Sequence, residues 1–181
     1  VDVRDMTQKE LRDKLGYVPQ KGVLFSGTID SNIRYGKPEI TDAQVKEAAE
    51  VAQATEFIDT KPEKYESPVS QGGTNVSGGQ KQRLSIARAI AKDPEIFILD
   101  DSFSALDFKT DSQLRKALKE YTKDATTVIV AQRISTILGA DQIIVLDDGH
   151  MAGIGTHKEL MANCEVYQQI ARSQLSEEEL A

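Results

Sequence analysis

Runs of apolar residues in the second half of the chain predict short buried strands over residues 95–99, 126–131 and 142–146. A further strand is predicted at 16–18, where Pro19 stops it. Strands of this kind that alternate with helices are typical of a parallel sheet. We expect a helix over about 104–123 to connect two of them, and a hairpin turn at 147–150. The pattern predicts an α/β fold.

Residues 21–73 lack such runs and instead show helical spacing. Short helices are predicted over 28–35 and 41–54, and the second begins with a Thr41/Gln44 capping box. A longer helix follows Ser77, and apolar residues recur along it at the spacing of one buried face, namely Leu84, Ala87, Ile90 and Ala91. This pattern predicts a helical lobe that is inserted, in the sequence, between the first strand and the later strands of the sheet.

Composition narrows the class of protein. The 181 residues are 39% hydrophobic and 28% charged, which suits one core or one core with a lobe. A net charge of −7 argues against a nucleic-acid partner, whose phosphates would be repelled. The single cysteine excludes an intrachain disulfide and suits a reducing compartment. No apolar run approaches the roughly 20 residues of a membrane helix, so any span would lie in another part of the protein.

The turn Ser77-Gly78-Gly79 is built to receive a phosphate. Adjacent glycines let backbone N–H groups approach an anion, the Ser77 hydroxyl adds a donor, and the helix that follows contributes the positive end of its dipole. An ordinary helix-capping turn is the alternative. Lys81 and Arg83 lie near enough to help hold phosphate charge, unless they and Arg88 form only a solvated basic face.

The run at 95–99 leads into two carboxylates, Asp100 and Asp101. A buried parallel strand delivers such acids at its carboxyl edge, where α/β sheets place ligands. The alternative is a core strand with two solvated capping acids.

Both segments resemble motifs of the ABC ATPases, in the order that this family has. Residues 76–80 resemble the signature loop, usually LSGGQ, with Val76 in the first place. The resemblance implies that these residues complete the ATP site of a partner domain, and it assigns nucleotide binding to Val76, Ser77, Gly78, Gly79 and Gln80. Asp100 and Asp101 resemble the end of a Walker B strand, which implies that Asp100 holds Mg²⁺ and that Asp101 polarises the attacking water.

Three further segments extend the resemblance. Gln20, in Val-Pro-Gln, resembles the Q-loop glutamine that senses Mg²⁺ and the attacking water. Gln132 stands at the switch position, where it would bind nucleotide and take part in catalysis. The segment after Walker B matches the D-loop, which crosses a dimer interface, at Ser104, Ala105, Leu106 and Asp107.

Two positions depart from the family pattern. Asp101 replaces the usual glutamate, so its carboxylate is one methylene shorter, and displacement by about 1 Å can cost roughly a hundredfold in rate. Gln132 replaces the usual histidine and cannot carry a positive charge. We expect the nucleotide site built on this chain's own motifs to bind ATP and hydrolyse it slowly or not at all, as in the degenerate half of a heterodimeric exporter. Neutral variation in a homodimeric exporter is the alternative.

The segment at 24–29 and the pair Asn32-Ile33 resemble those of ABC exporters. Residues 67–73 resemble in part the exporter X-loop, with Gln71 where a glutamate is common and Gly72 where an arginine is common. The resemblance implies contact with the coupling helices of a transmembrane domain, at the cytoplasmic face of the cell membrane.

The resemblance also implies a division of the chain. Residues 1–20 and 92–175 would belong to a partial P-loop NTPase core of the RecA-like type, 21–91 to the ABC helical subdomain with the signature helix, and 176–181 to an acidic tail.

No Gly-x-x-x-x-Gly-Lys-Ser/Thr motif occurs in the sequence. We therefore expect a C-terminal fragment that lacks the Walker A loop and that by itself binds ATP poorly and shows no appreciable hydrolysis. In the intact protein the expected ligands are ATP and Mg²⁺, the expected partner is a second ABC ATP-binding domain, and ATP-driven dimer closure would drive export. A soluble ABC protein with a regulatory or binding role is the remaining alternative.

Overall fold

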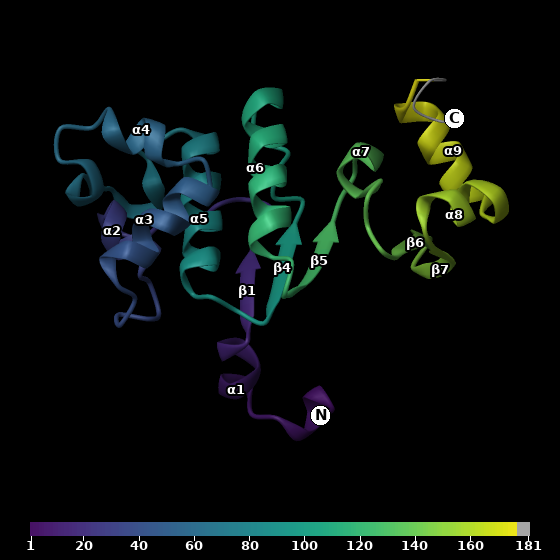
Figure 1. Ribbon diagram of the computed structural model, residues 1–181, viewed down its shortest axis with the longest axis horizontal. Coiled ribbons are helices and arrows are strands. Elements are labelled where there is room, and N and C mark those ends of the chain that lie inside the picture. Colours follow the sequence, from purple (N-terminus) through teal and green to yellow (C-terminus); the bar gives the residue numbers. More distant parts are fainter. Residues whose placement is uncertain (177–181) are drawn as a thin grey trace. The chain divides into compact units, whose positions relative to one another are not determined.

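The computed structural model describes residues 1–176, and contacts within the chain divide them into two units (Figure 1). The first unit is Val1–Val130, and the second begins at Ala131. The borders expected at residues 20 and 91 both fall inside the first unit, which contains the lobe and the sheet together. These borders therefore stay predictions. Most of the expected acidic tail, residues 177–181, lies outside the described residues.

The first unit contains a three-stranded parallel sheet, as the apolar runs predict. Its strands are β1 (Leu15–Val18), β4 (Ile96–Asp100) and β5 (Thr126–Val130), in the order β1-β4-β5. The register places Val18 opposite Leu99, and Leu99 opposite Ile129. Because side chains alternate along strands, one face of the sheet buries Val18, Phe97 and Leu99. On that face Phe97 packs edge-on against Tyr121 of α6 (Phe108–Tyr121).

The lobe consists of short helices, two of which have a threonine at the N-cap. Its elements are α2 (Ile29–Ile33), α3 (Asp42–Val51), α4 (Thr55–Asp59) and a small antiparallel pair of β2 (Gly27–Thr28) and β3 (Pro68–Val69). The capping box at Thr41 is confirmed: its hydroxyl accepts from the N–H of Gln44, whose side chain accepts from the N–H of Thr41. The lobe leads into α5 (Gly78–Ala91), whose predicted buried face is confirmed.

Short helical segments complete the first unit. They are η1 (Val3–Asp5), α1 (Gln8–Asp13), η2 (Lys64–Glu66) and η3 (Gln71–Gly73). Among residues 1–176, no helix has the length and apolar character needed to cross a bilayer.

The second unit contains the predicted hairpin, but its first strand does not join the parallel sheet. β6 (Ile143–Asp147) pairs antiparallel with β7 (His150–Gly155) in a separate two-stranded sheet, so the expectation of a parallel strand at 142–146 is wrong for the described residues. The turn favours this pairing, because Asp148 and Gly149 both have positive φ, at 45° and 78°. The remaining elements are α7 (Ile134–Ile137), α8 (His157–Asn163) and α9 (Glu165–Gln174).

Two arginines of α5 hold the lobe together, and neither belongs to a solvated basic face. Arg83 donates to the carbonyl of Gln53 at 2.6 Å and lies over the ring of Phe57. Arg88 donates to the backbone oxygens of Asn32 and Val23, at 2.7 and 2.9 Å. Burial lowers the pKa of Arg88 to about 10, so it stays charged near neutral pH. Arg83 is therefore engaged within the lobe and not at the Ser77 turn.

Asn32 is the polar centre of this packing. Only 1% of the residue is exposed, and its side-chain oxygen accepts from the N–H of Phe25 and from Arg88, each at 2.9 Å. Its amide group donates to the carbonyls of Phe25 and Thr28, also at 2.9 Å. Asn32 thus fixes the segment at 25–28 to α2.

We predict that Asn32→Ala lowers the free energy of unfolding of this chain by about 2–3 kcal/mol, because the groups around Asn32 would lose their partners inside the lobe. Urea denaturation followed by circular dichroism measures the change. The matched control is Asn163→Ala, at an exposed position at the end of α8, which we expect to change stability by less than about 0.5 kcal/mol. Equal effects of the two variants would contradict this role of Asn32.

Candidate nucleotide site

The predicted phosphate turn forms the N-terminus of α5, a helix of 14 residues. Ser77 is its N-cap: the Ser77 hydroxyl accepts from the N–H of Gln80 at 3.2 Å, and the Gln80 side chain accepts from the N–H of Ser77 at 3.1 Å. Gly78 is exposed, and apart from its chain neighbours and the backbone of its own helix, a Cβ on it would have no described atom within 4 Å. Val76 is 8% exposed and packs in the core. The turn thus presents the N–H groups of its glycines at an open surface.

The sheet brings Gln20 and Asp101 together although they are 81 residues apart in the sequence. Because β1 and β4 run parallel and in register, the segments that follow them meet at the same edge. The Gln20 side-chain amide donates to the Asp101 carboxylate at 3.1 Å. Asp101 has a positive φ of 43°, and its N–H donates to the carbonyl of Val130 at 2.9 Å. Gln20 and Asp101 therefore form one cluster, and the Q-loop role of Gln20 stays a prediction.

Tyr17 joins the same cluster, and sequence reasoning did not single it out. Its hydroxyl donates to the Asp100 carboxylate at 3.3 Å. Partial desolvation and the nearby charge of Asp100 raise the pKa of Tyr17. The alternation of β1 supplies a signal: Tyr17 is the outward-facing residue between buried Gly16 and Val18, and the register pairs it with Ile98, two residues before Asp100.

The predicted D-loop segment lies directly after the acids and beside the signature turn. The Ser104 hydroxyl donates to the carbonyl of Asp101 at 3.0 Å, and Leu106 is buried. A Cβ on Gly79 would come within 3.4 Å of the carbonyl oxygen of Ala105, so the two segments adjoin. Asp107 caps α6 by accepting from the N–H and hydroxyl of Thr110, and these bonds lower the pKa of Asp107.

Gln132 lies in the second unit, just before α7. Gln132 is exposed, and its backbone carbonyl accepts a hydrogen bond from the side chain of Gln174 at 2.9 Å. The same Gln174 side chain accepts from the N–H of Ile134 at 2.8 Å, which fixes the loop to α9. The role of Gln132 in nucleotide binding and catalysis stays a prediction.

The residues of the first unit have the chemistry that Mg²⁺ and a phosphate require. Asp100, Asp101 and Gln20 present oxygen ligands at one sheet edge, and Mg²⁺ is commonly held by one or two carboxylates together with substrate phosphates. Within residues 1–176, no cluster of three or more His, Cys, Asp or Glu side chains could hold a metal by itself. The two carboxylates and the amide fit a Mg²⁺ ion that is also bound by substrate phosphates.

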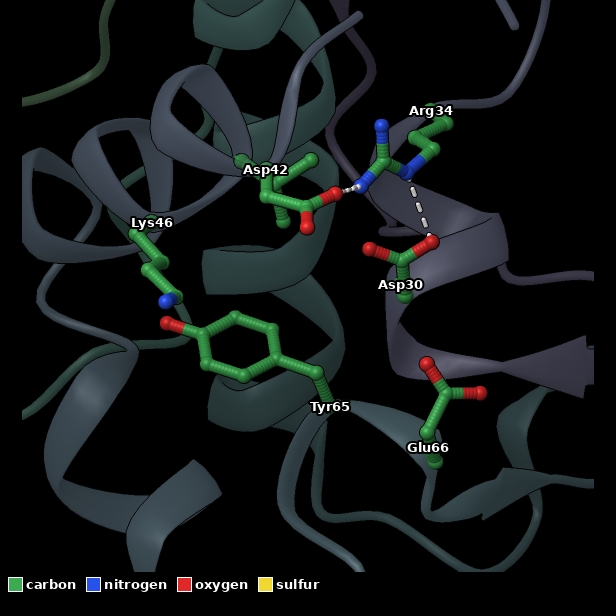
Figure 2. Close-up of a pocket in the computed structure, with 7 residues that line it drawn as sticks. Asp30, Arg34, Asp42, Lys46, Tyr65 and Glu66 are labelled. Atoms are coloured by element: carbon green, nitrogen blue, oxygen red, sulfur yellow. Dashed lines mark hydrogen bonds and ion pairs between the residues drawn. The ribbon is translucent and has the colours of Figure 1, made fainter.

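The lobe also contains a polar pocket of about 340 Å³, away from these motifs (Figure 2). Its lining residues are Asp30, Arg34, Asp42, Val45, Lys46, Tyr65 and Glu66. Figure 2 shows Arg34 directed at the carboxylates of Asp30 and Asp42, with which it forms ion pairs. The charge of Arg34 is neutralised by these two carboxylates, and none of the predicted site residues lines the pocket. We therefore interpret the pocket as a structural feature of the lobe and not as a part of the nucleotide site.

Comparison with known proteins shows the family to which the chain is similar. The family model described as ABC transporter matches residues 1–104. The chain is 45% identical over 177 residues to an uncharacterized ABC transporter ATP-binding protein of Mycobacterium tuberculosis, which covers 96% of this chain and 30% of the relative. It is also 45% identical over 169 residues to a putative multidrug export ATP-binding/permease protein of Staphylococcus aureus, covering 93% of this chain and 29% of the relative.

A solved structure agrees with these relatives. The structure of a bacterial Atm1-family ABC exporter with ATP bound matches with a TM-score of 0.92 and 39% sequence identity, covering 97% of this chain and 31% of that chain. The chain thus spans just under a third of the length of the proteins it matches. It belongs to the ABC transporter family and has the P-loop NTPase fold of the ATP-binding domains in that family.

Proposed function

We propose that this chain is part of the ATP-binding domain of an ABC exporter and couples ATP-driven dimerisation to export across a membrane. The observation that carries the proposal is the joint placement, in one unit, of an open signature turn at Ser77–Gly79 and a cluster of Gln20, Asp100 and Asp101. The kinship with multidrug export proteins and with an Atm1-family exporter supports the same function.

In this proposal each ATP lies between two domains. The sheet edge of one domain supplies Asp100, Asp101 and Gln20, and the partner domain supplies the N–H groups of its signature turn. Bound Mg²⁺ would neutralise charge on the β- and γ-phosphates. Gln20 orients the Asp101 carboxylate through their 3.1 Å hydrogen bond, and Ser104 fixes the backbone of Asp101. ATP thus holds the two domains together, and hydrolysis releases them.

The membrane domain would dock on the X-loop of the lobe, at the cytoplasmic face of the cell membrane. Gly72 and Gly73 both adopt positive φ, which gives the loop its tight form. The Asn75 side chain accepts from the N–H of Ser70 at 2.9 Å and donates to the carbonyl of Pro68 at 2.8 Å. Since Asn75 precedes Ser77 by two residues, a movement of the X-loop would reach the signature turn directly.

The site built on this chain's own motifs would hydrolyse ATP slowly. The Asp101 carboxylate accepts a hydrogen bond from Gln20 and is one methylene shorter than the family's glutamate, so it stays farther from the attacking water. Gln132 has a neutral amide at the position where the family has a histidine, which can carry a positive charge. The preferred partner is therefore a second ABC half-transporter with a complete catalytic acid, and the signature turn of this chain would serve that partner's site.

We predict that Asp101→Glu combined with Gln132→His raises the steady-state ATPase rate of the full-length protein, assayed without a catalytically complete partner, about tenfold or more. The longer carboxylate would reach the attacking water, and the histidine would contact the γ-phosphate. A phosphate-release assay measures the rate. Asp148→Glu, in the β6–β7 turn, is the control for an added methylene and should leave the rate unchanged. An ordinary rate in the unmodified protein, with no gain in the double variant, would instead favour a homodimer with competent sites.

We predict that Gly78→Asp abolishes hydrolysis at the partner's site, with at least a hundredfold loss, because a carboxylate would occupy the place of a phosphate. The position has open space, so the fold should persist. Gly139→Asp is the matched control, an exposed glycine whose Cβ would likewise have no described neighbour within 4 Å. Unchanged ATPase activity in the Gly78→Asp protein would refute the action of this turn on a partner.

A further inference from the structure

A buried glutamine of the signature helix holds the backbone on both sides of Gln20. Gln82 is 1% exposed, and its side-chain oxygen accepts from the N–H of Gly22 at 2.8 Å. Its amide nitrogen donates to the carbonyl of Pro19 at 3.1 Å. Both polar atoms of one side chain are therefore used on the residues that flank Gln20 and Lys21.

Close packing at Gly22 points independently to the same contact. A Cβ at position 22 would lie 2.8 Å from the carbonyl oxygen of Lys81 and 3.0 Å from the backbone nitrogen of Gln82. These distances are shorter than van der Waals contact, so only glycine lets the loop lie directly on the backbone of α5. The loop after β1 is thus seated on the first turns of the signature helix.

The same loop is tied on its other side to the segment that carries the acids. The buried Ser102 hydroxyl donates to the carbonyl of Val18 at 3.0 Å, and the Gln20 side chain donates to Asp101 at 3.1 Å. Residues 18–22 therefore lie between α5 and the end of β4, and Gln82 supplies the hydrogen bonds on the α5 side.

We propose that Gln82 is a positioning residue that couples the signature helix to Gln20. Any shift of α5, as its turn engages a nucleotide, would be passed through Gln82 to Pro19 and Gly22, and so to Gln20 and Asp101. The signature turn serves the partner's site, whereas Gln20 serves the site of its own chain, so Gln82 links the two ATP sites of a dimer. The link between sites rests on the proposed function, but the hold of Gln82 on the loop does not.

A spin label at position 21, introduced as Lys21→Cys in a cysteine-free background of the full-length protein, tests the hold directly. Lys21 is exposed and lies between the two anchored residues. We expect Gln82→Leu and Gly22→Ala each to increase the mobility of the label in its electron paramagnetic resonance spectrum. Ser85→Ala is the control, on the same helix, at a buried hydroxyl with no hydrogen-bond partner among the described residues, and it should leave the spectrum unchanged.

A double-mutant cycle tests the coupling. If Gln82 acts through Gln20, Gln82→Leu should lower the ATPase rate about fivefold in the native background and less than twofold in a Gln20→Ala background. Effects that simply multiply in the double variant, or a label at position 21 that stays rigid in both Gln82→Leu and Gly22→Ala, would overturn the proposal. A transporter that shows no ATPase activity when it contains a catalytically complete partner would refute the proposed function, while the label would still decide whether Gln82 holds the loop.

Discussion

The parallel pairing of β1 with β4 is the constraint on which the rest of the site depends. It places Val18 opposite Leu99, so the chain leaves both strands at the same edge and Gln20 meets Asp101. A slip by one residue would turn the buried faces of these strands outward and separate the two side chains, so the apolar core fixes the geometry of the polar cluster. The chemistry of the site is thus set by the packing beneath it.

Helix α5 is the second organising element, and it connects several parts of the first unit. Its N-terminus presents the predicted signature turn, and Gln82 contacts the loop after β1. Arg83 contacts Gln53, two residues after α3, and Arg88 binds Asn32. These polar contacts are largely shielded from water. Hydrogen bonds and charge interactions are stronger there, because the dielectric constant of the protein interior is lower. Under the proposed function, a movement of the turn would therefore be transmitted to the rest of the lobe.

The sequence predicts most of the elements and the members of the acidic cluster, because periodicity, capping boxes and the order of short motifs are local signals. It does not predict the roles of Arg83 and Arg88. A basic residue on a helix has the same sequence signal whether its side chain is solvated or donates hydrogen bonds to a backbone carbonyl. Tyr17 and Gln82 were missed because their partners are 83 and at least 60 residues away. The strand at 142–146 was assigned to the wrong sheet, because an apolar run specifies burial but not its pairing partner.

ATP-dependent dimerisation tests the central claim most directly, because a signature turn that completes a partner's site should hold two domains together only when nucleotide lies between them. The measurement is sedimentation velocity of the complete ATP-binding domain, with a Walker A segment joined to this chain, mixed with a partner ABC domain that carries a complete catalytic acid, in Mg-ATP, in Mg-ADP and without nucleotide. The account predicts dimers in Mg-ATP and monomers in the other two conditions. Monomers in all three conditions, under saturating Mg-ATP that is shown to bind, would contradict it.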